Sequence, residues 1–196
     1  MLFIAHRINT IEELKNVPKK YGVEIDIRGF GKRLIIQHEP FKDGIDFENW
    51  LKYYNHKFII LNVKEEGIEY KVKALMGKYN IQEYFFLDLS FPYLVKMANA
   101  GEKRVAIRFS EYESINTALA MAGKATWAWV DCFTKMPLGK KEYTVLARHF
   151  KICVVSPELQ GRSIEEIEGY KRKFSSFPID AVCTKRIDLW LDAGKG

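Results

Sequence analysis

The stretch FIILNV, residues 58–63, is the part of the sequence that says most about the fold. An almost unbroken apolar run of this length is typical of a strand buried on both faces of a parallel sheet. The segment that follows, 68–79, has the apolar spacing of a helix, and residues 84–89 are strand-like again. A strand, a helix and a second strand in this order predict parallel pairing through a right-handed crossover.

The same alternation continues toward both ends of the chain. Further strands are predicted at residues 2–5, 23–27, 105–109, 126–130, 152–155 and 179–183, with 34–37 as a hairpin extension of the second strand. Further helices are predicted at residues 10–21, 47–54, 92–99, 114–122, 141–150 and 163–174. Two of them are expected to begin with a capping box, formed by Thr10 with Glu13 and by Ser163 with Glu166.

Eight alternating units are the number that closes into a barrel. The sequence therefore predicts an α/β protein with a single compact (β/α)8 TIM barrel over residues 1–196, which is at the short limit for that fold. The alternative is an open doubly wound sheet. No G-x-G-x-x-G follows the first strand, which weakens the dinucleotide-binding form of that alternative.

The composition is that of a soluble protein with a substantial core. Hydrophobic residues make up 47% of the chain, yet no segment reaches the roughly 20 apolar residues of a membrane span. The apolar N-terminal run lacks a basic leader and a cleavage site, so we expect no signal peptide there. The three cysteines, which lie far apart inside apolar runs, are expected to be free thiols in the cytoplasm.

The formal net charge of +6 indicates an anionic partner, either a small phosphorylated molecule or nucleic acid. The basic residues are scattered along the chain, as at residues 19–20, 140–141 and 171–173. Such runs usually form solvated faces, and a nucleic-acid binder would need a clustered basic face. We therefore expect no nucleic-acid partner, and the sequence does not indicate an oligomeric state.

Function in such a barrel is expected at the carboxyl ends of the strands, where several polar residues fall. Glu24 and Asp26 are two apart on one strand, so their side chains share a face. Facing the barrel mouth, they form an oxygen site for Mg²⁺ or Ca²⁺. Alternatively, they pair with Arg7, Arg28 or Lys64 in a structural network.

Two of the four histidines, His6 and His38, fall at predicted strand ends near this carboxylate pair. Histidine titrates near neutral pH, so two of them can divide the roles of general base and general acid. We interpret His56 and His149 as packed or surface residues. Positive side chains that can bind a phosphate are expected around the same mouth at Arg7, Lys64, Arg108 and Lys185. Trp129 is expected to form part of the pocket wall.

The segments AHR (5–7), NT (9–10), EIDI (24–27) and QHE (37–39) resemble the opening of the glycerophosphodiester phosphodiesterase family. That family belongs with the phosphatidylinositol-specific phospholipase C-like barrels. The closing segment, 180–190, also resembles the family's last strand, whereas the middle of the chain shows little likeness.

The resemblance implies a phosphoric diester hydrolase of lipid metabolism that acts on a small glycerophosphodiester. In it, His6 and His38 are the acid-base pair and Arg7 holds the phosphate. Glu24 and Asp26 bind a divalent cation, Mg²⁺ or Ca²⁺, which assists cleavage. The third ligand of the family is a glutamate, and Asn62 stands at that position here. The site thereby loses one negative charge, so a barrel that binds a phosphate ligand with weakened catalysis is the alternative.

Overall fold

The computed structural model describes residues 1–191, and within them ten strands form a single sheet. The strands are β1 (Leu2–Ala5), β2 (Gly22–Phe30), β3 (Arg33–Ile36), β4 (Ile45–Asp46), β5 (Phe58–Val63), β6 (Tyr84–Leu87), β7 (Ala106–Phe109), β8 (Trp127–Val130), β9 (Lys151–Val155) and β10 (Ala181–Thr184). The helices are α1 (Ile11–Asn16), α2 (Phe47–Leu51), α3 (Glu69–Lys78), α4 (Phe91–Asn99), α5 (Ile115–Leu119), α6 (Lys140–Leu146), α7 (Glu166–Ser175) and α8 (Ile187–Leu191), with a 3₁₀ turn at Pro157–Gln160.

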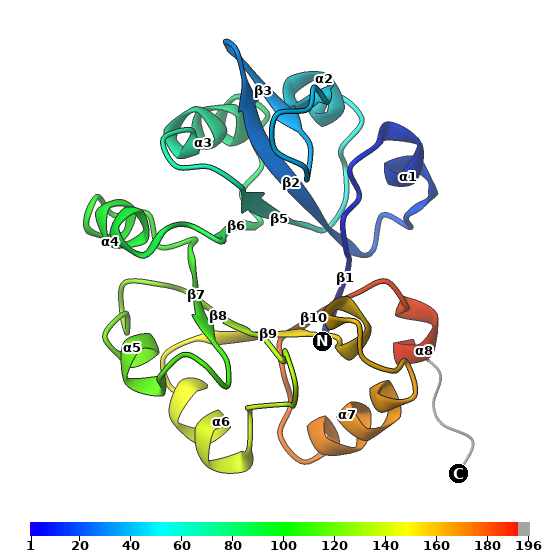
Figure 1. The fold of residues 1–196 in the computed structure, drawn as a ribbon, viewed down its shortest axis with the longest axis vertical. Helices are drawn as coiled ribbons and strands as arrows, with labels where there is room; N and C mark the ends of the chain where they lie inside the picture. The colour runs from blue at the N-terminus through cyan, green and yellow to red at the C-terminus, as the bar shows by residue number, and fades with distance from the viewer. Residues whose placement is uncertain (192–196) are drawn as a thin grey trace.

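The sheet curls around an interior, and the helices lie around its outside (Figure 1). Neighbouring strands pair in parallel in the order β6, β5, β2, β1, β10, β9, β8, β7. Between β6 and β7 the pairing is reduced to one parallel bridge, Phe86 with Val105. Because these strands run in the same direction, their carboxyl ends meet at one edge, which we call the mouth. The α/β class and the parallel order are as expected from the sequence.

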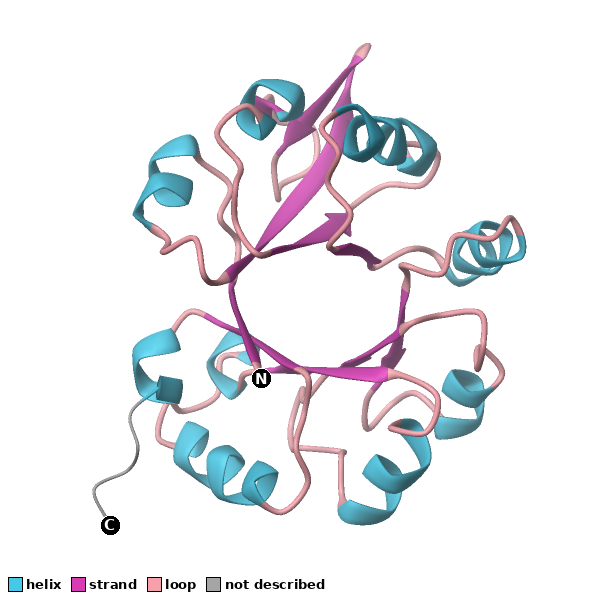
Figure 2. Cartoon of the chain, turned by 180° about the vertical axis from the view of Figure 1, so that it is seen from behind, coloured by secondary structure: helices cyan, strands magenta, loops and turns pink. Residues whose placement is uncertain are grey.

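The second strand continues into a hairpin, as the sequence indicated. β3 pairs antiparallel with the outer half of β2, and β4 pairs with β3. Figure 2 shows this hairpin projecting beyond the curled sheet. The turn passes through Gly31 at φ +59°, a left-handed conformation that glycine adopts without steric cost. The loop between β3 and β4 carries His38 to the mouth.

Aromatic side chains fill the inside of the sheet at the end opposite the mouth. The rings of Phe58, Phe85 and Trp127 lie 5.0–5.7 Å apart between centroids, although they come from β5, β6 and β8. Offset and edge contacts at this spacing are favourable for aromatic rings. Strands on opposite sides of the curl therefore share one core, as in a packed barrel interior.

The first helix is shorter than predicted, ending at Asn16 instead of residue 21. Val17 has extended backbone because Pro18 follows it, and a residue before proline disfavours the helical region. The capping box of Thr10 and Glu13 is confirmed: each side chain accepts from the other's backbone N–H.

The second predicted capping box, Ser163 with Glu166, is wrong. The helix α7 begins only at Glu166 and has no side-chain cap. Ser163 Oγ instead accepts from the N–H of Glu165, and the Glu166 carboxylate is bound by Arg162. A glutamate held by an arginine one turn earlier is not free to reach back to a capping backbone.

Within residues 1–191, none of the helices combines the length and apolar character needed to cross a membrane.

Candidate functional site

The first strand delivers His6 and Arg7 to the mouth. His6 donates its backbone N–H to the carbonyl of Thr184 at 3.0 Å, which continues the β1–β10 pairing by one residue. Arg7 then adopts φ +56°, an uncommon conformation for a residue with a side chain. In this conformation the Arg7 N–H points at the Glu24 carboxylate, 2.7 Å from Oε2. The chain turn after β1 thus serves the carboxylate on β2.

Glu24 and Asp26 both point inward and are buried, with 1% and 0% of their surface exposed. Asn62 lies beside them because β2 and β5 pair in a register that places it opposite Asp26. Its amide Nδ2 donates to Glu24 Oε1 at 2.8 Å. Burial, and after it the Asp26 carboxylate, raise the pKa of Glu24 from 4.5 to about 7. This carboxyl group therefore keeps its proton to a higher pH than an exposed glutamate does.

Asp26 has its own set of partners. Asn9 Nδ2 donates to Asp26 Oδ2 at 2.9 Å, and the Asp26 N–H donates to Asn9 Oδ1 at 3.0 Å. Arg7 Nε lies 3.4 Å from Oδ2, and Lys64 Nζ lies 3.3 Å from Oδ1. The ion pairs to Arg7 and Lys64 that the sequence offered as an alternative are thus present, whereas Arg28 bonds elsewhere.

His6 lies directly against this pair, with Nε2 3.7 Å from Glu24 Oε2. Its Nδ1 is buried and has no hydrogen-bond partner. Burial is the main cause that lowers the pKa of His6 from 6.5 to about 4, and the nearby Arg7 charge adds to it. His6 is therefore a neutral imidazole at neutral pH, the form that accepts a proton.

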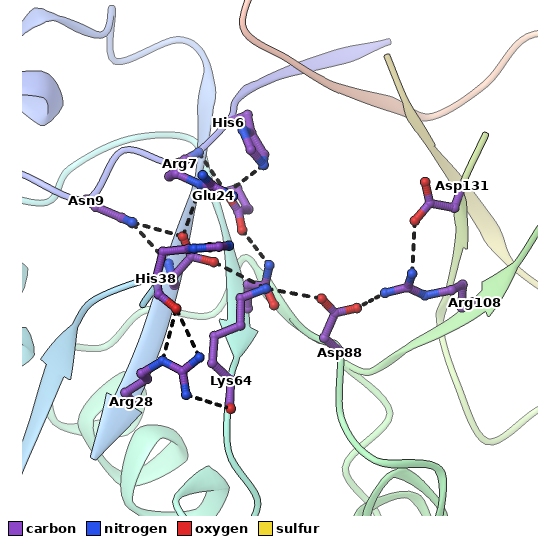
Figure 3. Close-up of polar contacts among 12 residues, drawn as sticks. His6, Arg7, Asn9, Glu24, Arg28, His38, Lys64, Asp88, Arg108 and Asp131 are labelled. Carbon is purple, nitrogen blue, oxygen red and sulfur yellow. Dashed lines mark hydrogen bonds and ion pairs between the residues drawn. The ribbon is translucent and has the colours of Figure 1, made fainter. Parts of the chain in front are cut away.

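His38 lies on the loop after β3, and Figure 3 shows its carbonyl bound by Arg28. Its side chain is 37% exposed, and Nδ1 lies 2.7 Å from Glu39 Oε1. The contact with His38 lowers the pKa of the Glu39 carboxyl, so an anion faces that ring nitrogen. The Glu39 carboxylate orients the His38 ring through this contact.

The Arg28 side chain binds the backbone of the loop that carries His38. Its Nε and Nη2 donate to the His38 carbonyl at 3.1 and 2.9 Å, and Nη1 donates to the Lys64 carbonyl at 3.0 Å. One guanidinium therefore ties the histidine loop to the end of β5 (Figure 3). The sequence indicated Arg28 only as a partner of the carboxylates. Its place two residues after Asp26, on the inward face of β2, was the available signal.

A row of alternating charges crosses the mouth from β5 to β8, and Figure 3 shows it from end to end. Lys64 Nζ lies 3.3 Å from Asp88 Oδ2, Arg108 binds the other oxygen of Asp88, and Arg108 Nη1 lies 3.0 Å from Asp131 Oδ2. We call Lys64, Asp88, Arg108 and Asp131 the charge row. Burial opposes the charge of Arg108, but Asp88 and Asp131 outweigh it and raise the pKa of this group.

The two remaining predicted residues lie in different surroundings. Trp129 is only 5% exposed and lies one row deeper than Asp131 on β8, so it forms part of the floor of the mouth. Lys185 follows β10 and lines, together with His6 and Arg7, a hollow of about 520 Å³. Its backbone N–H donates to Glu158 Oε1 at 3.0 Å, which holds the strand end in place.

Glu24, Asp26 and Asn62 offer an oxygen donor set that suits a hard cation. Asn62 Oδ1 is buried without a hydrogen-bond partner, and Asp26 Oδ1 is buried with the Lys64 ammonium 3.3 Å away. The adjacent carboxylates repel each other, which a cation would relieve. Among residues 1–191, no three His, Cys, Asp or Glu side chains form a metal site. A cation here would therefore depend on the neutral amide oxygen of Asn62 as its third protein ligand.

The sequence matches no protein-family model and no curated protein, but the fold matches known structures. A glycerophosphodiester phosphodiesterase from Agrobacterium tumefaciens strain C58 superposes with a TM-score of 0.68 and 14% identity, over 96% of this chain and 98% of that chain. A glycerophosphoryl diester phosphodiesterase from Parabacteroides distasonis ATCC 8503 superposes with a TM-score of 0.64 and 12% identity, over 94% and 82%. This chain therefore has the fold of the glycerophosphodiester phosphodiesterases, which is the resemblance that its terminal motifs indicated.

Proposed function

We propose that this chain is a phosphoric diester hydrolase, built on a closed (β/α)8 barrel, that cleaves a small glycerophosphodiester-type substrate. The observation that carries the proposal is His6, with Nε2 3.7 Å from Glu24 beside the buried Asp26, together with His38 on a loop that Arg28 ties to the end of β5. The two histidines come from separate elements and differ in environment. A shared fold with phosphodiesterases supports this choice of reaction.

In the proposed reaction the histidines have opposite roles. His6, neutral because its pKa is lowered to about 4, accepts the proton of the attacking hydroxyl group. His38, whose Nδ1 lies 2.7 Å from Glu39 Oε1, donates a proton to the leaving alcohol. The two rings take opposite roles because His6 is buried against Glu24, whereas His38 is more exposed and lies beside a carboxylate.

Positive side chains bind the phosphodiester. Arg7, which is 41% exposed and pairs with Asp26 at 3.4 Å, has donors free for a phosphate oxygen. Lys64 and Lys185 add charge on either side of His6. Trp129, buried two residues before Asp131, would contribute apolar surface beneath the bound substrate. Preorganised donors of this kind stabilise the charge that develops on phosphate oxygens in the transition state.

Glu24, Asp26 and Asn62 would hold a divalent cation, Mg²⁺ or Ca²⁺, through the oxygens described above. When bound, the cation would supply Lewis-acid stabilisation of a phosphate oxygen. The protein's own contribution is to keep these oxygens buried and to orient them with Arg7 and Asn9.

The test is a set of phosphodiesters, including glycerophosphocholine and a chromogenic bis-aryl phosphate, assayed with EDTA, Mg²⁺ or Ca²⁺. We expect hydrolysis that falls at least 100-fold in His6→Ala and in His38→Ala. His149→Ala is the matched control, because His149 is exposed and contacts Phe150 on the opposite face of the molecule. Full activity in both variants would refute the acid-base assignment.

A second candidate, a barrel that binds a phosphate ligand without turnover, is favoured by Asn62. Its amide nitrogen, rather than an acidic oxygen, faces Glu24. In that case a phosphodiester would bind in calorimetry while no product forms under any of the cation conditions.

A further inference from the structure

The two cations of the charge row are already neutralised by the protein itself. Asp88 stands between Lys64 and Arg108, with Oδ2 3.3 Å from Lys64 Nζ and Oδ1 bound by Arg108 Nη2. Arg108 also pairs with Asp131 at 3.0 Å. A phosphate that approaches Lys64 and Arg108 therefore meets the carboxylate of Asp88 between them.

The backbone holds Asp88 in this place by an uncommon conformation. Asp88 directly follows β6 and has φ +59°, which costs a residue with a side chain some conformational energy, although Asp tolerates it better than most. Its side chain is one quarter exposed and stands between two hollows of about 360 and 290 Å³, one toward Lys64 and one toward Arg108. Residues in such conformations are concentrated at functional sites.

Charges around the mouth are nearly balanced as a result. Four cationic side chains, Arg7, Lys64, Arg108 and Lys185, are accompanied by five acidic ones, Glu24, Asp26, Asp88, Glu113 and Asp131. A balanced site favours a ligand of low charge. Each further negative charge on the ligand is attracted by the cations but repelled by Asp88. A phosphodiester carries one negative charge, whereas a phosphate monoester carries about −1.5 to −2 at pH 7.

We propose that Asp88 is a specificity-determining residue that admits singly charged phosphodiesters and disfavours doubly charged phosphate monoesters. The inference rests on the proposed function and extends it, since cleavage of a diester leaves a monoester in the same mouth. By weakening the hold of Lys64 and Arg108 on that product, Asp88 favours its release. It acts through these cations and not on the reacting atoms.

The experiment measures binding of inorganic phosphate by calorimetry, in EDTA, to the wild type and to Asp88→Asn. Asn also tolerates a positive φ, so this variant removes the charge and keeps the backbone. We expect phosphate to bind at least 10-fold more tightly to Asp88→Asn. Asp131→Asn should show a smaller gain, because Arg108 keeps Asp88 as a partner. The matched control is Asp43→Asn, whose carboxylate pairs with Arg33 on the hairpin and should leave phosphate binding unchanged.

An unchanged or weaker phosphate affinity in Asp88→Asn would overturn the proposal and would make Asp88 a structural brace. Thermal unfolding establishes that the variant is folded, and Asp88→Gly, which also accepts φ +59°, is the second variant. The readout does not depend on turnover. A wild type that cleaves no diester would refute the proposed function, while the difference in phosphate affinity would still decide the role of Asp88.

Discussion

The two sides of the mouth hold their acidic residues in different ways. On the histidine side, at the ends of β1, β2 and β5, Glu24 and Asp26 are buried side by side, and hydrogen bonds supply most of the contacts to Glu24. On the opposite side, at the ends of β6, β7 and β8, each carboxylate of the charge row is matched by a cation. Within residues 1–191, the only ion pair of Glu24 is with His6, whereas Asp88 and Asp131 both pair with Arg108.

This difference leads us to expect the reaction on the histidine side and the selection of the ligand at the charge row. Burial, and after it the neighbouring Asp26 carboxylate, raise the pKa of Glu24 to about 7, and a buried acidic pair of this kind would also attract a cation. In the charge row each cation is already paired with a carboxylate, so the row binds a further ion only weakly. We therefore expect it to select ligands by their charge and shape. The following experiments test this contrast, in order of decreasing effect.

The largest effect on stability is expected from Glu24→Gln, and it should grow with pH. The folded state holds a proton on Glu24 up to about pH 7, whereas the unfolded state releases it near 4.5, so wild-type stability falls as pH rises through this window. This pKa difference corresponds to roughly 3 kcal/mol. The unfolding free energy of the variant relative to wild type should therefore increase by up to that amount between pH 5 and 8.

Urea unfolding in EDTA at several pH values measures this difference. His6, whose lowered pKa gives the opposite slope between pH 4 and 6.5, lies 3.7 Å from Glu24, so the comparison is repeated in a His6→Ala background. Glu12→Gln, at an exposed position of α1, is the matched control and should show no such trend. A difference between Glu24→Gln and wild type that does not vary with pH would show that the histidine side is as well compensated as the charge row.

A smaller effect, on catalysis, is expected from Arg28→Met. The change removes three hydrogen bonds to the His38 and Lys64 carbonyls and frees the loop that carries the histidine. We expect kcat to fall about 10- to 100-fold with little change in KM, because misplacement of a reacting group affects the transition state more than binding.

Steady-state kinetics over a range of pH check this role. Arg28→Lys should recover part of kcat, and the pH profile should keep its shape, because the protonation of the histidines is not altered. Arg33→Met is the control on the same hairpin. The Arg33 guanidinium pairs with the Asp43 carboxylate and not with the His38 or Lys64 carbonyls. An equal loss in both variants would assign the effect to the hairpin in general.

The smallest effect is expected on the opposite side, from Gln160→Ala. Gln160 Nε2 donates to Asp131 Oδ1 at 2.6 Å, and Arg108 remains paired with the other oxygen. We expect a loss of about 1 kcal/mol in unfolding free energy, with kcat/KM changed less than twofold. A large loss of kcat/KM would mean that the charge row takes part in the reaction and not only in selection.

The hydrophobic pattern was sufficient to predict most of the secondary structure. Runs such as 58–63 can be satisfied only by burial on both faces, so β5 lies where it was expected. The end of α1 was predicted too late because the apolar spacing continues past Pro18, and a local backbone restriction stopped the helix. The capping box at Ser163 failed because Arg162 competes for Glu166, a contact that the motif does not encode.

For the site, the amino-acid order alone establishes which side chains point inward at the strand ends, since alternation along a strand is a local property. That is why the spacing of Glu24 and Asp26 was enough to place them together on one face. Their partners, by contrast, follow from tertiary structure. Strand register brought Asn62 beside Asp26, the conformation of Asp88 set its carboxylate between two cations, and Arg28 turned to backbone carbonyls. Distances between strands depend on how the whole sheet curls, which no local pattern specifies.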